Sequence, residues 1–160
     1  DRIIGQAEPV IKDSEGKEAV IDGTQDDSQY LRHCSDREKE SLLNFGKGFC
    51  KEYYIFMAGK YDPTYGYQRL MPYVKLGSDL DERLKLAIDG LYYAHTQGVT
   101  TDSVEINDAM WLADGLYLAM YTTTYTTHGA DGTIEQKSDN MKLIIVETAG
   151  EYRAVSQELY

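Results

Sequence analysis

The chain has very few cysteines. Cys34 and Cys50 are the two in 160 residues, which is too few for a disulfide framework of the kind that small secreted scaffolds use. If the segment between them is helical, their Cα atoms lie roughly 24 Å apart at ~1.5 Å per residue. A disulfide needs Cα atoms within about 7 Å. We therefore expect two free thiols, with Cys50 buried as a small apolar residue.

The sequence also lacks the common signatures of catalysis and metal binding. No G-x-S-x-G motif marks a serine nucleophile, and Cys50 beside an apolar stripe is poorly placed for a reactive thiolate. The three histidines, His33, His95 and His128, form no i, i+4 pair. The segment "DGTQDDSQ" lacks the residue order of a calcium loop. We expect neither a bound metal nor a cofactor.

Positive charge and long apolar runs are scarce. The chain has 16 Lys and Arg against 27 Asp and Glu, a net charge of -11. Such a charge repels the phosphates of nucleic acids and anionic lipid headgroups, so nucleic acid is not an expected partner. No apolar run approaches the ~20 residues that cross a bilayer, so we expect no membrane insertion by this segment.

Residues 1–33 have the composition of an acidic N-terminal linker or arm. They contain few large apolar side chains and two turn-like clusters, "KDSEGKE" and "DGTQDD". The segments "PVI" and "AVI" flank the "DSEG" turn, which predicts at most a weak hairpin, because an isolated two-stranded ribbon is marginally stable. The folded domain is expected to span residues 35–160.

Helical periodicity dominates the first half of that domain. Ser35 and Glu38 match the S-x-x-E capping box, and apolar residues then recur every three or four positions on a helix ending near Tyr61. One short helical turn is expected between Tyr67 and Met71. A second long helix is predicted to begin at Ser78 and to end at Gly98.

After Gly98 the period changes from 3.6 to 2, which is typical of strands. The segments 103–114, 115–128, 133–148 and 151–160 read as four strands joined by "DG", "GADG" and "AG" turns. Helices followed by a meander predict an α+β fold, with the N-terminal helices packed on one face of a curved antiparallel sheet.

This order of elements resembles the nuclear transport factor 2-like superfamily, which includes ketosteroid isomerase and the polyketide cyclases. The segments that carry the likeness are "FGKGFCKEYYIFMAGKY", "YVKLGSDLDERLKLAIDGL" and the closing "AGEYRAVSQELY". The resemblance implies a cone-shaped fold with a pocket between sheet and helices. Within the superfamily, the chain looks most like non-catalytic extracytoplasmic domains of Gram-positive bacterial envelope proteins, where a membrane anchor and an acidic linker precede the cone.

The resemblance leaves two functions open, because one fold hosts enzymes and binding modules alike. The leading interpretation is a non-enzymatic extracytoplasmic domain that binds a protein partner or a small ligand. The alternative is a small lyase or isomerase with Asp108 or His128 as the base and Tyr53 as a donor. A pocket holding a carboxyl or imidazole within ~3 Å of a tyrosine hydroxyl would favour the enzyme. The residues expected to line the pocket are Tyr53, Met57, Trp111, Leu118 and Met120.

The stretch "LYLAMYTTTYTTHG" carries the last prediction. If His128 pairs with Thr133, Leu118 and Met120 lie on the core face, and Asp139 lies opposite Thr122 at a solvated end of the hairpin. The opposite, outward face then carries a stripe of tyrosines, which is a candidate interface for a homodimer formed through the sheet: Tyr117, Tyr121 and Tyr125. A shift of one residue would exchange the two faces of the partner strand.

Overall fold

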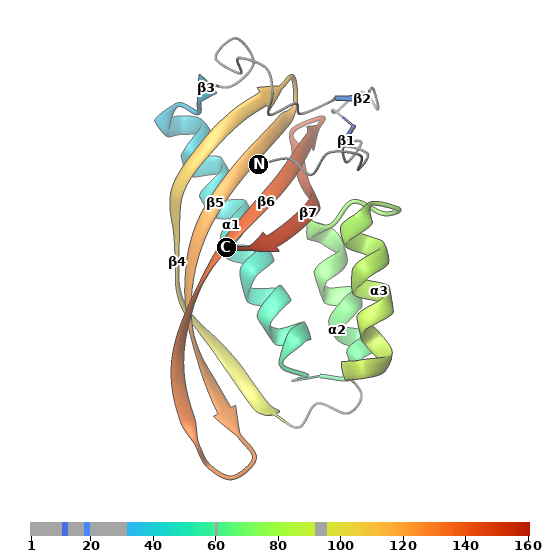
Figure 1. The fold of residues 1–160 in the computed structure, drawn as a ribbon, viewed down its shortest axis with the longest axis vertical. Helices are drawn as coiled ribbons and strands as arrows, with labels where there is room; N and C mark the ends of the chain where they lie inside the picture. Colours follow the sequence, from blue (N-terminus) through green and yellow to red (C-terminus); the bar gives the residue numbers. More distant parts are fainter. Residues whose placement is uncertain (1–10, 13–17, 20–31, 60, 92–95) are drawn as a thin grey trace, which may run out of the picture.

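The computed structural model describes residues 11–12, 18–19, 32–59, 61–91 and 96–160 (Figure 1). Its helical elements are α1 (Asp36–Met57), α2 (Pro63–Leu70), the 3-10 turn η2 (Met71–Tyr73) and α3 (Asp79–Leu91). Its strands are β1 (Ile11–Lys12), β2 (Glu18–Ala19), β3 (Arg32–His33), β4 (Thr96–Ala113), β5 (Leu116–Gly129), β6 (Ile134–Thr148) and β7 (Glu151–Leu159). Strands β3 to β7 form one antiparallel sheet in chain order.

The helices lie together on one side of this sheet. Figure 1 shows α1 running along one face of the strands, with α2 and α3 side by side next to it. The predicted α+β class, with N-terminal helices on a curved antiparallel sheet, is therefore confirmed. No helix among the described residues combines the length and the apolarity needed to span a bilayer.

Local sequence signals explain where the helices begin. Ser35 and Glu38 form the predicted capping box, in which the Ser35 Oγ accepts from the Glu38 N–H and a Glu38 carboxylate oxygen accepts from the Ser35 N–H. The segment expected to hold one helical turn is an eight-residue helix, α2. Asp62 caps it by accepting from the Thr64 and Tyr65 N–H groups, and Pro63 suits its first turn.

Several expected boundaries change. Helix α1 ends at Met57 and not near Tyr61, and β4 begins at Thr96 and not at residue 103. The second long helix does not end at Gly98, because α3 stops at Leu91 and Gly98 already pairs with His128 inside the sheet. The weak hairpin is present as a two-residue ladder between β1 and β2, while most of the arm at 1–33 lies outside the described residues. The last two residues of that arm, β3, pair with Met110 and Trp111 of β4, so they join the sheet.

Polar contacts join the helices to one another. Glu52 on α1 binds the Arg69 guanidinium on α2 through both carboxylate oxygens, at 2.9 and 3.0 Å. Asp81 on α3 is fully buried and accepts from the Tyr67 hydroxyl on α2 and from the Gly77 N–H at 2.8 Å. These bonds satisfy buried carboxylates that would otherwise destabilise the packed helices.

The register of β5 against β6 differs from the prediction by one residue. His128 lies opposite Ile134 and not Thr133, so Tyr121 faces Met141, and Thr123 faces Asp139. The reason is the "GADG" turn, in which the Gly132 N–H donates to the Gly129 carbonyl and Gly132 takes a positive φ of 86°. This turn accommodates one more residue between the strands than the predicted pairing allows.

The faces of β5 are consequently reversed relative to the prediction. Tyr117 and Tyr121 are buried and Tyr125 is half-buried, and all three pack with the main core under the helices. The expectation that these tyrosines face outward is wrong. The outward side of the sheet instead carries a second apolar cluster, which we call the outer cluster: Met110, Leu112, Ala113, Leu116, Leu118, Ile144, Val146 and Val155.

Tyr121 packs directly on the backbone of α1. Its fully buried hydroxyl donates to the Leu42 carbonyl at 2.6 Å. A Cβ built at Gly46 would lie 2.2 Å from the Tyr121 ring, so only glycine fits beneath it. The sequence suggests that glycines weaken this helix, whereas here Gly46 permits the closest approach of helix and sheet.

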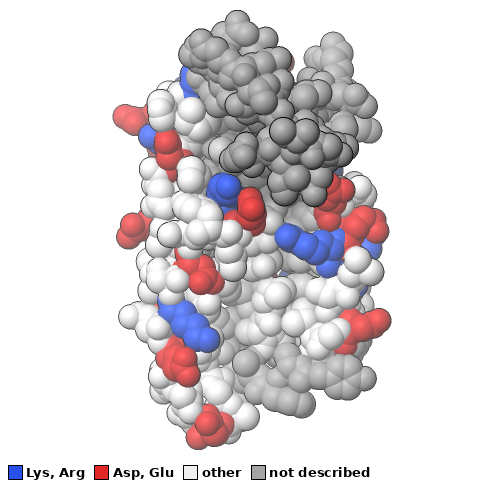
Figure 2. Space-filling view, viewed as in Figure 1, with Lys and Arg blue, Asp and Glu red and all other residues white. Residues whose placement is uncertain are grey.

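Charged side chains of both signs are interspersed on the surface. Figure 2 shows small red and blue groups separated by uncharged atoms, and no broad basic area on the described surface of this face. Several of the charges are paired, as in the contacts of Lys142 with Glu158 at 3.3 Å and of Arg153 with Glu151 at 3.7 Å. Such exposed pairs add little to stability.

The substitution Gly46→Ala tests the contact with Tyr121. We expect it to lower the free energy of unfolding by about 2 kcal/mol, because the new methyl group overpacks a fully buried ring. Gly90→Ala on α3 is the matched control, since no atom lies within 4 Å of the added Cβ, and it should stabilise by up to ~1 kcal/mol. Urea denaturation measures both, and a Gly46→Ala protein as stable as the control would contradict the packing.

Candidate functional site

The predicted catalytic residues lie in separate parts of the fold. Asp108 on β4 is opposite Met120 of β5, whereas His128 lies eight residues further along β5, or ~26 Å away at ~3.3 Å per residue. Tyr53 lies on α1 and packs with the core. Asp108 and His128 therefore cannot serve one reacting group together.

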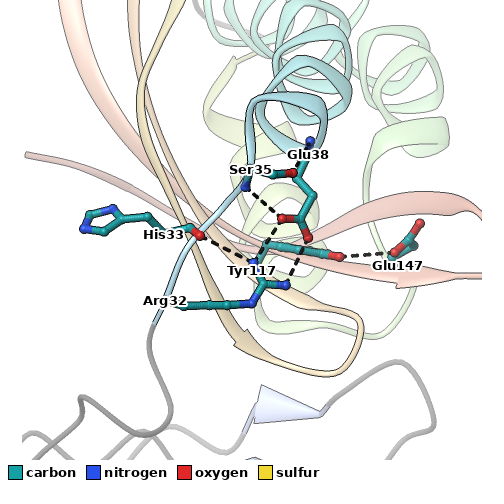
Figure 3. Close-up of polar contacts among 6 residues, drawn as sticks. All are labelled: Arg32, His33, Ser35, Glu38, Tyr117 and Glu147. Carbon is teal, nitrogen blue, oxygen red and sulfur yellow. Dashed lines mark hydrogen bonds and ion pairs between the residues drawn. The ribbon is translucent and has the colours of Figure 1, made fainter.

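Asp108 belongs to a polar cluster where β3 meets α1. Its carboxylate lies 3.1 Å from the His33 Nδ1 and 3.8 Å from the Lys39 Nζ. Figure 3 shows Arg32 reaching from the neighbouring strand to Glu38 on α1. The two hydrogen bonds between them measure 3.0 and 3.3 Å. They connect the first turn of α1 to β3 of the sheet.

The same cluster accounts for Trp111, which was expected to line a pocket. The Arg32 guanidinium lies over the Trp111 ring at 5.2 Å, a cation–π contact. Beside it, the Tyr117 hydroxyl points toward the Glu147 carboxylate at 3.4 Å (Figure 3). These side chains contact one another, so we interpret this end of the sheet as a structural contact between β3, α1 and the sheet, and not as a ligand pocket.

A second polar group lies on the concave face of the sheet, under the later turns of α1. The Tyr54 and Tyr125 hydroxyls both donate to the Oδ2 atom of Asp139, at 2.9 and 3.0 Å. Their rings stack at 4.2 Å between centroids. Asp139 faces inward because it is the register partner of Thr123, whose side chain is fully buried.

Burial and the neighbouring carboxylate keep both tyrosines protonated. Burial raises the pKa of Tyr125 to about 12, and its hydrogen bond to Asp139 acts in the same direction. The pKa of Tyr54 is raised further by the same two causes, with burial the larger. Both hydroxyls are therefore neutral donors at physiological pH.

Gln157 of β7 and Arg83 of α3 extend this region. The Arg83 Nη2 donates to the Gln157 backbone oxygen at 2.9 Å and to its Oε1 at 2.5 Å. The Tyr53 ring lies edge-on to the Tyr54 ring, with 5.3 Å between the centroids. Burial raises the pKa of Tyr53, the Arg83 charge and the Gln157 amide lower it, and the Asp139 charge raises it. We call the set of Tyr53, Tyr54, Tyr125, Asp139 and Gln157 the concave site.

Three buried polar atoms in or beside the concave site have no hydrogen-bond partner within the described part of the chain. They are the Gln157 Nε2 and the hydroxyls of Thr101 and Thr123. Thr101 is opposite Tyr125, and Thr123 is opposite Asp139. Two of the three lie beside another polar group, Thr123 beside the Cys50 thiol and Gln157 beside the Tyr53 hydroxyl. Buried polar atoms without well-formed hydrogen bonds are uncommon in folded proteins, so the concave site is the candidate functional site.

The expected pocket residues are divided between the two faces. Tyr53 belongs to the concave site, while Leu118 lies in the outer cluster. Met120 is opposite Asp108 and Lys142 on that outward face, and Met57 is 41% exposed. The prediction that Leu118 and Met120 lie on the core face is wrong, because the register of β5 against β6 differs by one residue from the predicted register. Asp139 was missed because the predicted register put it among solvated threonines.

The remaining reactive groups add no further site. Both cysteines are free, and Cys50 is buried, as expected; Cys34 is buried as well. Burial raises the pKa of each thiol to about 11, which disfavours a thiolate. Among the residues that the structure describes, no three His, Cys, Asp or Glu side chains are grouped as metal ligands.

Glu38 gives the fold a testable pH dependence. The Arg32 hydrogen bonds, the Ser35 N–H and the Arg32 charge lower the pKa of Glu38 from 4.5 to about 2. Its stabilisation is therefore complete above about pH 4.5 and is lost as the pH falls toward 2. Glu38→Gln should be less stable at pH 7 and should show a shallower loss of stability between these pH values.

Arg32→Gln tests whether the guanidinium is the cause. Arg32→Gln should also reduce the acid dependence, and the double variant should lose less stability than the sum of the two single variants, because the residues act through one contact. Urea denaturation from pH 2 to pH 7 measures all four proteins. Additive effects would show that Glu38 and Arg32 are energetically independent.

Comparisons with known proteins identify the fold. No family model and no curated protein sequence matches the chain. Among solved structures, the intermembrane space region of the chloroplast protein ARC6 matches with a TM-score of 0.59 at 6% identity, covering 76% of this chain and 95% of that one. An NTF2-like protein involved in plasmid conjugation matches with a TM-score of 0.55 at 13% identity, covering 94% of this chain and 55% of that one.

These matches confirm the predicted fold, which is the nuclear transport factor 2-like cone. This chain spans about half the length of the conjugation protein. At such identities the likeness concerns the fold alone, and one fold supports many functions.

Proposed function

We propose that this chain is a non-enzymatic binding domain that works outside the cytoplasm, with the concave site as its ligand-binding surface. One observation carries the proposal: the Tyr54 and Tyr125 hydroxyls both donate to the same Asp139 oxygen. An acid–base site needs donors aimed at the oxygen that gains charge in the reaction. Here the donors and the carboxylate bind one another, which suits recognition better than catalysis.

The packing of the cone supports the same interpretation. Tyr121 fills the space between α1 and the middle of the sheet, and its ring contacts Gly46. Within the concave site, Tyr53, Tyr125 and Asp139 are half-buried, whereas Tyr54 and Gln157 are buried. The extracytoplasmic location rests on the composition of residues 1–33, which resembles the acidic linkers of envelope proteins.

One observation favours the enzyme alternative. Asp139 lies within the ~3 Å of a tyrosine hydroxyl that an acid–base site requires. In a lyase or isomerase, Asp139 would remove a proton from the carbon beside a carbonyl group. A tyrosine would then have to turn from Asp139 to the carbonyl oxygen and stabilise the enolate.

Solvent deuterium exchange separates the two functions. Cyclic ketones, from cyclohexanone to a steroid 3-ketone, are incubated in D2O with the wild type or with Asp139→Asn. Proton NMR measures the rate at which the α-protons of the ketone exchange for deuterium. We expect this rate to be the same with either protein as in buffer alone. A faster exchange with the wild type that is lost in Asp139→Asn would establish the enzyme and refute the binding-only proposal.

A homodimer through the sheet remains a proposal, but with other residues than the tyrosines. Tyr121 is fully buried within its own chain and cannot contact a second copy. The outward face offers half-buried apolar side chains of the outer cluster, the kind of surface that homodimers bury: Met110, Leu118, Ile144 and Val155.

Light scattering tests this dimer. We expect the wild type to have the mass of two chains and Leu118→Glu that of one, because a charge in an apolar interface is strongly unfavourable. Leu86→Glu is the matched control, since Leu86 on α3 is 82% exposed and lies outside the outer cluster. A wild type with the mass of one chain at micromolar concentration would refute the dimer.

A further inference from the structure

We infer that the concave site recognises a small extended molecule that carries an ammonium group at one end and an oxygen acceptor, such as a carboxylate, at the other. The inference rests on the proposed function, because it names the ligand class of that same site. Asp139 would bind the ammonium group, Gln157 would donate to the oxygen, and Tyr53 would lie between the two ends of the ligand.

The acidic end of the site has a carboxylate oxygen available. The Oδ2 atom of Asp139 accepts hydrogen bonds from the Tyr54 and Tyr125 hydroxyls. The Oδ1 atom accepts no hydrogen bond within the described part of the chain. The two lysines of the same strand are paired elsewhere, Lys137 with Glu135 at 4.0 Å and Lys142 with Glu158 at 3.3 Å. A half-buried carboxylate without a cationic partner attracts an ammonium group, which supplies charge-assisted hydrogen bonds.

The opposite end of the site has a donor without an acceptor. Gln157 is 5% exposed, and its Nε2 makes no hydrogen bond within the described residues. Arg83 holds the amide by binding its Oε1 and its backbone oxygen. One Nε2 proton is directed at the Tyr53 hydroxyl, which leaves the other for a ligand. The guanidinium also adds positive charge at this end, so a carboxylate is a better acceptor here than a neutral oxygen.

Tyr53 connects the two ends. Its ring contacts the edge of the Tyr54 ring at 5.3 Å between centroids and stacks on Phe49 at 5.7 Å. The Arg83 charge and the Gln157 amide lower its pKa, and the Asp139 charge raises it. On the sheet, Gln157 is opposite Leu143, four residues from Asp139, a backbone distance of about 14 Å at ~3.4 Å per residue. The side chains of Asp139 and Gln157 shorten the distance between the carboxylate and the amide. The remaining distance matches a ligand whose charged ends are separated by several methylene groups better than an α-amino acid.

The test uses three probes that each have a six-carbon chain: 6-aminohexanoate has both charged ends, n-hexylamine has only the ammonium group, and hexanoate has only the carboxylate. They are titrated into the wild type while the side-chain amide signal of Gln157 and the ring signals of Tyr53 and Tyr125 are followed by NMR. We expect 6-aminohexanoate to shift these signals and to bind about tenfold more tightly than either single-ended probe, since each end adds one charge-assisted contact.

Two variants assign the ends. Asp139→Asn keeps an acceptor for both tyrosines and should weaken 6-aminohexanoate and n-hexylamine about tenfold while leaving hexanoate unchanged. Gln157→Leu should weaken 6-aminohexanoate and hexanoate and spare n-hexylamine. Asp102→Asn is the matched control, because this carboxylate is bound by Thr126 at 2.6 Å outside the concave site, and it should leave all three affinities unchanged.

The inference is overturned if none of the probes shifts these signals at millimolar concentration, or if 6-aminohexanoate binds Asp139→Asn as tightly as the wild type. Either result leaves the binding-only function standing, provided that the ketones show no protein-dependent deuterium exchange. Exchange that depends on Asp139 would refute the function itself, whatever the three probes do.

Discussion

The contact of Tyr121 with the backbone of α1 determines which side of the sheet becomes the interior. The ring lies over Gly46, and its hydroxyl satisfies the Leu42 carbonyl at 2.6 Å. Because side chains alternate along a strand, anchoring Tyr121 under the helix also directs Tyr117 and Tyr125 to that side. The pairing of β5 with β6 then brings Asp139 to the same face, where it meets Tyr54 of α1.

Patterns confined to one segment made much of the fold predictable. The Ser35 and Glu38 capping box, the helical spacing of α1 and the change to period 2 required no tertiary information, and each is confirmed. The register of β5 against β6 was not predictable, because it depends on how Gly129 and Gly132 close the turn. Tyrosine is also ambiguous, since its ring suits a core and its hydroxyl suits a surface.

The concave site is unpredictable from the sequence for the same reason. Tyr54 and Asp139 are 85 residues apart in the chain, and their contact follows from the register and from the packing of α1. The site combines a carboxylate with satisfied tyrosine donors at one end and an unpartnered amide at the other. A preorganised arrangement of this kind favours binding, because the protein groups need little rearrangement when a ligand arrives.

Cross-strand NOEs test the central claim, that the tyrosine stripe faces α1 and brings Asp139 with it. The register predicts NOEs between directly opposed residues, such as Tyr121 with Met141 and Thr123 with Asp139. It also predicts contacts of the Tyr121 ring protons with Leu42 and Gly46. NOEs that pair Tyr121 with Asn140, together with no contact between the Tyr121 ring and α1, would contradict the account.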